Sequence, residues 1–245
     1  MEKIIDVHMH LGKCRVFGLE ITRQQLLEYI SKYNLTAVIV QPFPGAPNPI
    51  EVHNEIYELG IKFPKKIYGL ASVNPLLDED YVKKELERAL GSLGFVGVKL
   101  HTAGHSISPA NPRSKILFDT AAKYKVPVMI HTGPGPFSDP ALALDRIEEY
   151  PDVKIILAHA GFGVYFSTAY LLAKKYDNVY LDTSWTYVYD LAKIVAELPD
   201  KILFATDLIE NAPVEFAKVE ALRLRDDIRE KYLFTNAKKV FNLNI

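Results

Sequence analysis

Residues 154–159 read KIILAH, a continuous apolar run rich in β-branched side chains that ends in a histidine. Residues 127–131, PVMIH, repeat this pattern. Parallel strands that are covered by helices on both faces of their sheet have near-continuous apolar sequences of this kind. The two stretches therefore predict buried parallel strands, each ending in a polar residue.

The same unit occurs eight times along the chain. The predicted strands are residues 4–8, 37–41, 67–73, 95–101, 128–131, 155–159, 179–182 and 202–204. Helix-period segments follow them at 22–33, 49–62, 78–90, 113–124, 140–150, 164–176, 188–198 and 213–229. The polar strand ends are 23 to 32 residues apart, about the length of one strand–helix unit. Eight such units predict one α/β domain over residues 1–245, a (β/α)8 TIM barrel.

A doubly wound open sheet is the alternative to the barrel. That fold carries a glycine-rich phosphate-binding turn after its first strand, and HLGKCRVFG at 10–18 has no G-x-G-x-x-G. No linker-like change of composition divides the chain. A last short helix at 236–241 is expected to close the bottom or the side of the barrel.

Composition excludes several classes of partner. The formal net charge of −1, without basic blocks, gives no electrostatic case for nucleic acid or an anionic membrane. No apolar run approaches the roughly 18–20 residues of a transmembrane helix. The single cysteine, Cys14, excludes an intrachain disulfide, and no apolar leader follows the first residues. We therefore expect a cytoplasmic protein.

Ionisable side chains gather at the predicted strand ends, which is where barrel enzymes carry their chemistry. Period two places His8 and His10 on one face of the first strand. The other strand-end groups are Lys99, His101, His131, His159, Asp182 and Asp207. Any one of these can be an ordinary hydrogen-bonded core residue. Together, imidazoles and carboxylates from separate strands predict an open catalytic site for a divalent metal such as zinc.

Several stretches resemble a known family. DVHMH at 6–10, with His131, His159 and Asp207, resembles the amidohydrolase superfamily of metal-dependent barrels. NEIYELGIKFPKKIYGLASVNP at 54–75, GFVGVKLH at 94–101 and TNAKKVFNLN at 235–244 resemble its amidohydrolase 2 branch, which contains lactonases and other hydrolases as well as non-oxidative decarboxylases. The resemblance covers essentially the whole chain. The chain is short for that branch, so small substrate loops are expected.

The resemblance implies a set of roles. His8, His10, His131 and Asp207 become ligands of one divalent metal, with Zn2+ expected. Asp207 and His159 become the catalytic groups that exchange protons with a metal-activated water. In the two-metal alternative, a carboxylated Lys99 bridges both ions and His159 binds the second. The candidate substrate contacts are Lys99, His101, Phe137 and Trp185.

Other residues receive ordinary interpretations. His53 is expected on a helix surface, His105 in a solvated loop, and Cys14 as a small buried side chain. Asp6 shares the face of His8 and His10 by periodicity, so it is expected to hydrogen-bond behind the metal ligands. The candidate cations for an anionic substrate are Lys13, Arg15, Lys99 and Arg113.

Three functions follow from this pattern. The first is a hydrolase that directs metal-activated water at the carbonyl of a small lactone, amide or ester. The second is a metal-dependent, non-oxidative decarboxylase (a lyase) of a small, in some cases aromatic, carboxylate, which requires a cation beside the metal. The third, a barrel that binds a metal or metabolite without turnover, is disfavoured because no expected position is missing. A small-molecule substrate is expected, and a homo-oligomer is left open.

Overall fold

The apolar runs form parallel strands, and helices follow them in alternation. The computed structural model describes residues 2–245. The strands are β1 (Ile5–Cys14), β2 (Leu19–Ile21), β3 (Ala37–Pro42), β4 (Ile67–Ser72), β5 (Gly97–Leu100), β6 (Val128–His131), β7 (Ile155–Ala158), β8 (Val179–Asp182) and β9 (Ile202–Leu203). The helices are α1 (Arg23–Lys32), α2 (Pro49–Lys62), α3 (Glu79–Glu87), α4 (Lys115–Tyr124), α5 (Leu144–Glu149), α6 (Phe166–Lys175), α7 (Val188–Glu197), α8 (Ala212–Ala221), α9 (Asp226–Glu230) and α10 (Asn236–Val240).

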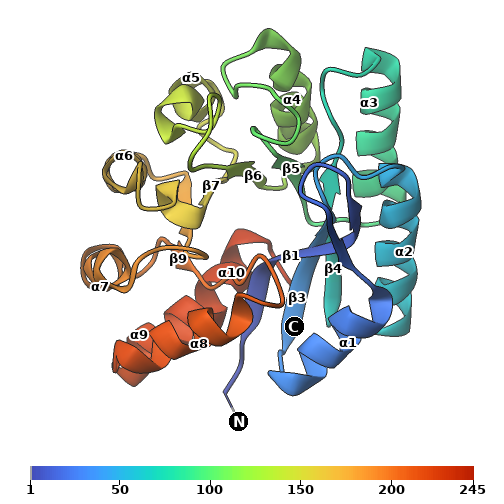
Figure 1. Ribbon diagram of the computed structural model, residues 1–245. Coiled ribbons are helices and arrows are strands. Elements are labelled where there is room, and N and C mark those ends of the chain that lie inside the picture. Colours follow the sequence, from blue (N-terminus) through green and yellow to red (C-terminus); the bar gives the residue numbers. More distant parts are fainter. Residues whose placement is uncertain (1) are drawn as a thin grey trace.

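The strands form one curved sheet in the order β2-β1-β3-β4-β5-β6-β7-β8-β9, parallel except for β2. The first and last parallel strands meet through a bridge between Met9 and Asp207. The Val7 amide donates to the Phe204 carbonyl at 3.1 Å, and the Asp207 amide to the His8 carbonyl at 2.8 Å. The sheet thus closes on itself with the helices outside it (Figure 1), which confirms the predicted TIM barrel.

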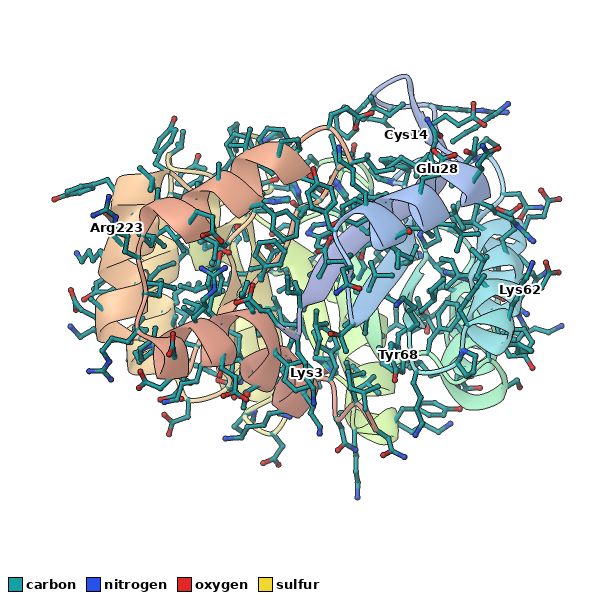
Figure 2. All side chains as sticks on the ribbon, turned by 90° about the horizontal axis from the view of Figure 1, so that it is seen from below. Lys3, Cys14, Glu28, Lys62, Tyr68 and Arg223 are labelled. Atoms are coloured by element: carbon teal, nitrogen blue, oxygen red, sulfur yellow. The ribbon has the colours of Figure 1, made fainter. Side chains whose placement is uncertain are left out.

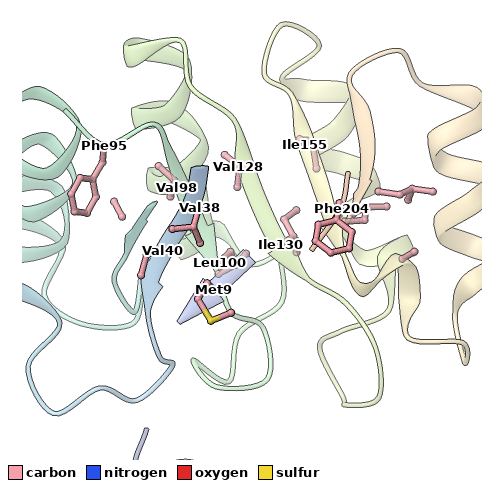
Figure 3. Close-up of a cluster of buried hydrophobic side chains, with 14 of the residues drawn as sticks. Met9, Val38, Val40, Phe95, Val98, Leu100, Val128, Ile130, Ile155 and Phe204 are labelled. Carbon is pink, nitrogen blue, oxygen red and sulfur yellow. The ribbon is translucent and has the colours of Figure 1, made fainter. Parts of the chain in front are cut away.

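Two apolar clusters explain why the strands are hydrophobic on both faces. The outer cluster lies between strands and helices and includes Val98, Leu100, Val128 and Ile130 (Figure 3). The inner cluster fills the barrel from β1, β3, β4, β6, β7 and β9; its members on these strands are Ile5, Val7, Ala37, Ile39, Leu70, Met129, Ile156, Ala158 and Leu203. Burial of both faces stabilises the barrel and leaves only the strand ends for polar chemistry.

The carboxyl ends of the strands form the mouth of the barrel, and the opposite end is closed. α10 and the π-helical turn before it, η5 (Lys231–Thr235), pack Phe234, Ala237 and Val240 against the inner cluster. This confirms the closing role expected for residues 236–241. Cys14 and Lys3 mark the two ends of the barrel in the side view of Figure 2. Within residues 2–245, none of the helices combines the length and hydrophobicity that a bilayer crossing requires.

Two differences between the structure and the predicted elements are larger than changes at the ends of an element. β1 continues beyond residue 8 and pairs with the unpredicted antiparallel β2, from Gly12 opposite Ile21 to Cys14 opposite Leu19. The predicted helix at 213–229 is two helices, α8 and α9, because Arg223 between them has a left-handed backbone, with φ of 47°. Neither glycine nor proline marks that break, so the sequence carries no ordinary stop signal there.

Candidate metal centre

Three side-chain atoms converge at the mouth of the barrel. His8 Nε2 lies 3.3 Å from His10 Nε2, and Asp207 Oδ1 lies 3.1 Å from the first nitrogen and 3.2 Å from the second. The imidazoles are buried, and the Asp207 side chain is 16% exposed. Closure of the barrel between β1 and the segment after β9 brings His8 and Asp207 together, although they lie 199 positions apart in the sequence.

These separations fit a metal ion. A cation about 2.0–2.1 Å from each donor sets neighbouring donors about 3.3–3.4 Å apart in tetrahedral coordination and about 2.8–3.0 Å apart in octahedral coordination. The three observed distances, 3.1 to 3.3 Å, lie within this span. Two imidazole nitrogens and a carboxylate oxygen are also a donor set suited to divalent transition metals. His8, His10 and Asp207 therefore form a candidate divalent-metal site.

The protonation states of His10 and Asp207 also fit a metal site. Burial lowers the pKa of His10 to about 4, so its ring is neutral at pH 7. In the metal-free protein, burial acts to raise the pKa of Asp207, but the charge of His8 and the hydrogen bond from His10 Nε2 hold that pKa well below its usual range; a bound ion would replace that hydrogen. A neutral imidazole and an ionised carboxylate are the forms that bind metal.

Groups behind the donors orient both rings. Asp182, at the end of β8, lies 2.6 Å from His8 Nδ1, and the Pro42 carbonyl lies 3.2 Å from His10 Nδ1. A hydrogen on each Nδ1 leaves each Nε2 lone pair facing the site. The sequence identifies Asp182 as a strand-end residue but indicates no particular role for it. Its alignment with the ligand positions was the signal that could have found it.

Asp182 is itself held as an anion. Burial opposes its ionisation, but the charge and hydrogen bond of His8, with His159 and Ser184, lower the pKa of Asp182 to about 2. Such a carboxylate–histidine pair fixes the tautomer of a metal-ligating ring and raises its basicity. Asp182 is therefore the group that prepares His8 for a cation.

The expectation that Asp6 shares a face with His8 and His10 is wrong. The pairing of β1 with β3 shifts register between Asp6 and Met9, which breaks the alternation. The Asp6 carboxylate instead accepts from the hydroxyl of Tyr29 on α1 and from the backbone amides of His8 and Thr206. Asp6 thus holds the backbone of both ligand-bearing segments rather than a ligand ring.

His159 lies beside the three donors, and its ring stacks on that of His8 at 5.1 Å between centroids. Ser184 Oγ donates to Asp182 Oδ1 at 2.7 Å and lies 2.8 Å from His159 Nδ1. Since the hydroxyl hydrogen is used on Asp182, Ser184 accepts the Nδ1 hydrogen of His159. His159 Nε2 then carries the lone pair of the ring and can accept from Nδ1 of His131, which lies 3.1 Å away.

His131 is separated from the three donors by the ring of His159. Its ring contacts His159 and stacks on His101, with centroids 4.2 Å apart and planes 12° apart. Nδ1 of His101 accepts from the Gly104 amide at 3.0 Å, which fixes the His101 ring in its loop. The ligand role of His131 and the substrate role of His101 stay predictions.

Three non-glycine residues in this site have left-handed backbones. His159 after β7, Trp185 after β8 and Asp207 after β9 have φ of 63°, 60° and 66°. Such a conformation costs about 1 kcal/mol or more for each residue with a Cβ. Backbone strain occurs at three successive strand ends, on the side of the barrel mouth that carries His159 and Asp207. Strain of this kind clusters at functional sites, so it marks this side of the mouth as functional.

Lys99 reaches the donors from β5. Its side chain is fully buried, and Nζ lies 3.1 Å from His8 Nε2. Burial lowers the pKa of Lys99 to about 8, although the charges of Asp207 and Asp182 act in the opposite direction. At pH 7 Lys99 is thus a buried cation next to the metal donors.

The two predicted aromatic contacts have different positions. Trp185 Nε1 donates to Asp207 Oδ2 at 2.8 Å, and its ring stacks on Phe162, a residue that the sequence analysis did not select. Trp185 thus occupies the second oxygen of the carboxylate ligand. Phe137 is half-buried in the segment after β6, and its substrate role stays a prediction.

Two histidines outside the donor set were predicted incorrectly. His53 is fully buried rather than on a helix surface, with Nδ1 2.6 Å from Glu85 Oε1 and Nε2 accepting from the Ser72 amide. His105 is buried rather than solvated.

The candidate cations other than Lys99 have other surroundings. Arg113 donates to the carbonyls of Pro75 and Leu77 and so ties two loops together. Lys13 is exposed beside Glu20, and Arg15 is exposed as well. Cys14 is buried as expected and donates to the Pro44 carbonyl. Of the four cations considered, Lys99 is the one that the structure places at the donors.

A closed parallel barrel with a His–His–Asp donor set at its mouth is typical of metal-dependent barrel enzymes. The chain belongs to the amidohydrolase family, whose model, described as Amidohydrolase, matches residues 5–243. This confirms the resemblance drawn from DVHMH and the later motifs. The family is one of enzymes.

Solved structures share the fold over the full chain. A 2,6-dihydroxybenzoate decarboxylase from Rhizobium is 20% identical, with a TM-score of 0.78 and all of both chains covered. A dihydroxybenzoic acid decarboxylase from Polaromonas, with bound manganese and 2-nitroresorcinol, is 20% identical, with a TM-score of 0.76 over 100% of this chain and 98% of that one. A 5-carboxyvanillate decarboxylase from Sphingomonas paucimobilis is 12% identical, with a TM-score of 0.74 and full coverage of both chains. No curated protein matches the sequence.

Proposed function

We propose that this protein is a metal-dependent, non-oxidative decarboxylase of a small aromatic carboxylate. The observation that carries the proposal is Lys99, a buried cation 3.1 Å from a metal-donor nitrogen. A lyase of this kind needs such a cation to hold the carboxylate that it removes, whereas attack of water on a neutral carbonyl does not. The aromatic carboxylates named for the similar decarboxylase structures support the same substrate class.

The metal would be held by His8, His10 and Asp207, and we expect zinc on this nitrogen-rich set, although one similar structure contains manganese. When bound, a divalent cation supplies Lewis-acid polarisation of a substrate oxygen. The proposal adds His131 as a fourth ligand to this three-donor set. It takes one ion rather than two, because a Lys99 carboxylated to bridge a second ion on His159 would no longer be the cation that pairs with the substrate.

The chain's own residues then have distinct tasks. Lys99 pairs with the substrate carboxylate and so fixes the carbon that will lose it. His159 exchanges a proton at Nε2, since Ser184 holds the hydrogen on Nδ1. Burial lowers the pKa of His159 to about 4, so its ring is neutral at rest and releases a proton readily. His159 Nε2 first takes up a proton from solvent and passes it to the carbon that carries the carboxylate. The C–H bond forms as the C–C bond breaks, carbon dioxide leaves, and the His159 ring is neutral again.

Metal analysis followed by a substrate panel tests the proposal. The purified protein should contain close to one divalent ion per chain, and an aromatic carboxylate should release carbon dioxide without incorporating oxygen from labelled water into the organic product. Lys99→Gln should lose turnover while keeping its metal. Hydrolysis of a lactone, amide or ester with label in the product would instead establish the hydrolase, which uses the same donors. Absence of a metal that copurifies or restores turnover would refute both.

A further inference from the structure

Two buried polar atoms on neighbouring strands have no hydrogen-bond partner within residues 2–245. They are Oε1 of Gln41 on β3 and Oγ of Ser72 on β4. Gln41 is fully buried, and Ser72 is 2% exposed. An unpaired buried polar atom costs about 1–3 kcal/mol, and in native proteins such an atom calls for a bound water, ion or ligand. Ser72 Oγ can donate to a ligand, whereas Gln41 Oε1 can only accept from one, and the donor of Gln41 is its Nε2. The two atoms on adjacent strands indicate a polar ligand site.

Both side chains point into the barrel at its mouth. Ile39 on β3 and Leu70 on β4 belong to the inner cluster. Side chains alternate along a strand, so Gln41 and Ser72, two residues further on, also face inward. Each lies one layer closer to the mouth than the apolar filling of the barrel.

The metal donors lie next to this pair. Gln41 pairs in register with His10, and Ser72 pairs with Lys99. Gln41 Nε2 lies 3.4 Å from His10 Nε2, and Lys99 Nζ lies 3.1 Å from His8 Nε2. These two ring nitrogens are the ones that would bind the cation. When they do, the Gln41 amide and the Lys99 ammonium both need a new acceptor.

The charge around the mouth selects the kind of acceptor. Asp182 on β8 and Asp207 after β9 lie on one side of the ring, and Lys99 on β5 lies on the other. A divalent ion on the donors would offset the charge of Asp207, so an anion is attracted to the ion and to Lys99, which pairs in register with Ser72. An oxyanion accepts from an amide, a hydroxyl and an ammonium at once.

We propose that Gln41, Ser72 and Lys99 form a carboxylate-binding wall on β3, β4 and β5, which holds the acid group of the substrate. Lys99 provides the charge, and Gln41 and Ser72 donate the hydrogen bonds that set the orientation. The inference deepens the proposed function and rests on it for the presence of a metal and of a carboxylate substrate.

A buried network holds the wall in place without a ligand. The Ser72 amide donates to His53 Nε2 at 3.1 Å, and His53 Nδ1 lies 2.6 Å from Glu85 Oε1. Glu85 also accepts from Arg88 at 2.7 and 2.8 Å. The end of β4 is thus fixed from outside the barrel, which leaves the Ser72 hydroxyl free for a ligand and lowers the ordering cost of binding.

Calorimetric binding of benzoate to the metal-loaded protein tests the wall, with benzamide as the uncharged probe of the same shape. Gln41→Leu and Ser72→Ala should each raise the Kd for benzoate about tenfold or more, since each removes a hydrogen bond to a charged group. Benzamide binding should change less, and the metal content should stay that of the unmodified protein.

Ser114→Ala is the matched control. Its hydroxyl is buried like that of Ser72 but donates to the carbonyls of Pro109 and Asn111. Ser114→Ala should lower the Tm and leave benzoate binding unchanged, whereas Ser72→Ala should not lower the Tm, because an unpaired hydroxyl is removed.

The outcomes separate the wall from the proposed function. Weakened benzoate binding in the Gln41 and Ser72 variants supports the wall even if no aromatic carboxylate releases carbon dioxide, a result that would count against the decarboxylase alone. Unchanged Kd values for benzoate in both variants, or equal losses for benzoate and benzamide, would overturn the wall even in an active decarboxylase. Absence of benzoate binding to the unmodified, metal-loaded protein at millimolar concentration would overturn it as well.

Discussion

Asp182→Asn tests whether the metal centre depends on the carboxylate behind His8. Asp182 Oδ2 lies 2.6 Å from His8 Nδ1, and Oδ1 accepts from the amide and the hydroxyl of Ser184 at 2.9 and 2.7 Å. An asparagine keeps its carbonyl oxygen toward these two donors and so turns its NH2 group toward His8 Nδ1. His8 accepts that bond only with its hydrogen on Nε2, the atom that faces His10.

The substitution should lower both the metal affinity and the free energy of unfolding. Loss of an orienting partner lowers metal affinity 10- to 100-fold, or about 1.4–2.7 kcal/mol. We expect the upper end for Asp182→Asn, because the new tautomer also withholds one of the three donors. In the metal-free protein, burial raises the pKa of Asp182 but His8 and His159 lower it from 3.8 to about 2. The anion therefore contributes about 2 kcal/mol of stability above pH 4, which is lost as the pH falls through 2 and which asparagine cannot supply.

The assay is titration of the metal-free protein with Zn2+ against a competing chelator, together with urea unfolding at pH 7. Asp119→Asn is the control, since Asp119 is exposed and accepts only from Tyr150 among the described side chains. The Asp182 variant should bind Zn2+ about 100-fold more weakly and unfold at lower urea concentration. A Zn2+ Kd within twofold of the unmodified protein would refute the role given to this carboxylate.

Other predictions concern the donors, acid stability and one loop contact. His8→Ala should lose metal binding, whereas His159→Ala should keep one ion and lose turnover; elemental analysis and activity check both, and full metal occupancy in His8→Ala would contradict the ligand set. In the metal-free protein, burial lowers the pKa of His10 and of His159 from 6.5 to about 4. The free energy of unfolding is therefore highest above pH 6.5 and falls by up to about 3 kcal/mol for each ring as the pH falls to 4. Urea unfolding at pH 5 should show a lower midpoint than at pH 7. A higher midpoint at pH 5 would contradict this prediction. Gly104→Ala should lower the Tm, because its Cβ would lie 2.1 Å from Pro44 Cβ, and an unchanged Tm would show that the loop moves freely.

Some of the site could be predicted because barrel chemistry lies at strand ends. His8, His10 and Asp207 follow apolar runs directly, and parallel strands in a closed ring present their carboxyl ends at one face. The position of a residue along the chain does not show which of the polar side chains at the mouth converge on one point. His131 occupies an equivalent strand end, yet its ring contacts His159 rather than the three donors.

The errors have a common physical origin. Asp6 was assigned to the wrong face because a bulge breaks the alternation of β1, and a bulge depends on pairing with β3. His53 was assigned to a helix surface, but α3 covers it and Glu85 pairs with it. In both cases the partner comes from a distant segment, which local periodicity does not describe.

The sequence by itself determined the eight-unit barrel, the closing helix and the strand-end positions of the chemistry, because apolar periodicity and unit length are local properties of the chain. Only the tertiary structure decided that Asp182 orients His8, that Lys99 reaches the donors, and that Gln41 and Ser72 carry unpaired atoms beside them. Those facts depend on distances of 2.6 to 3.4 Å between side chains on different strands, and closure of the ring sets such distances.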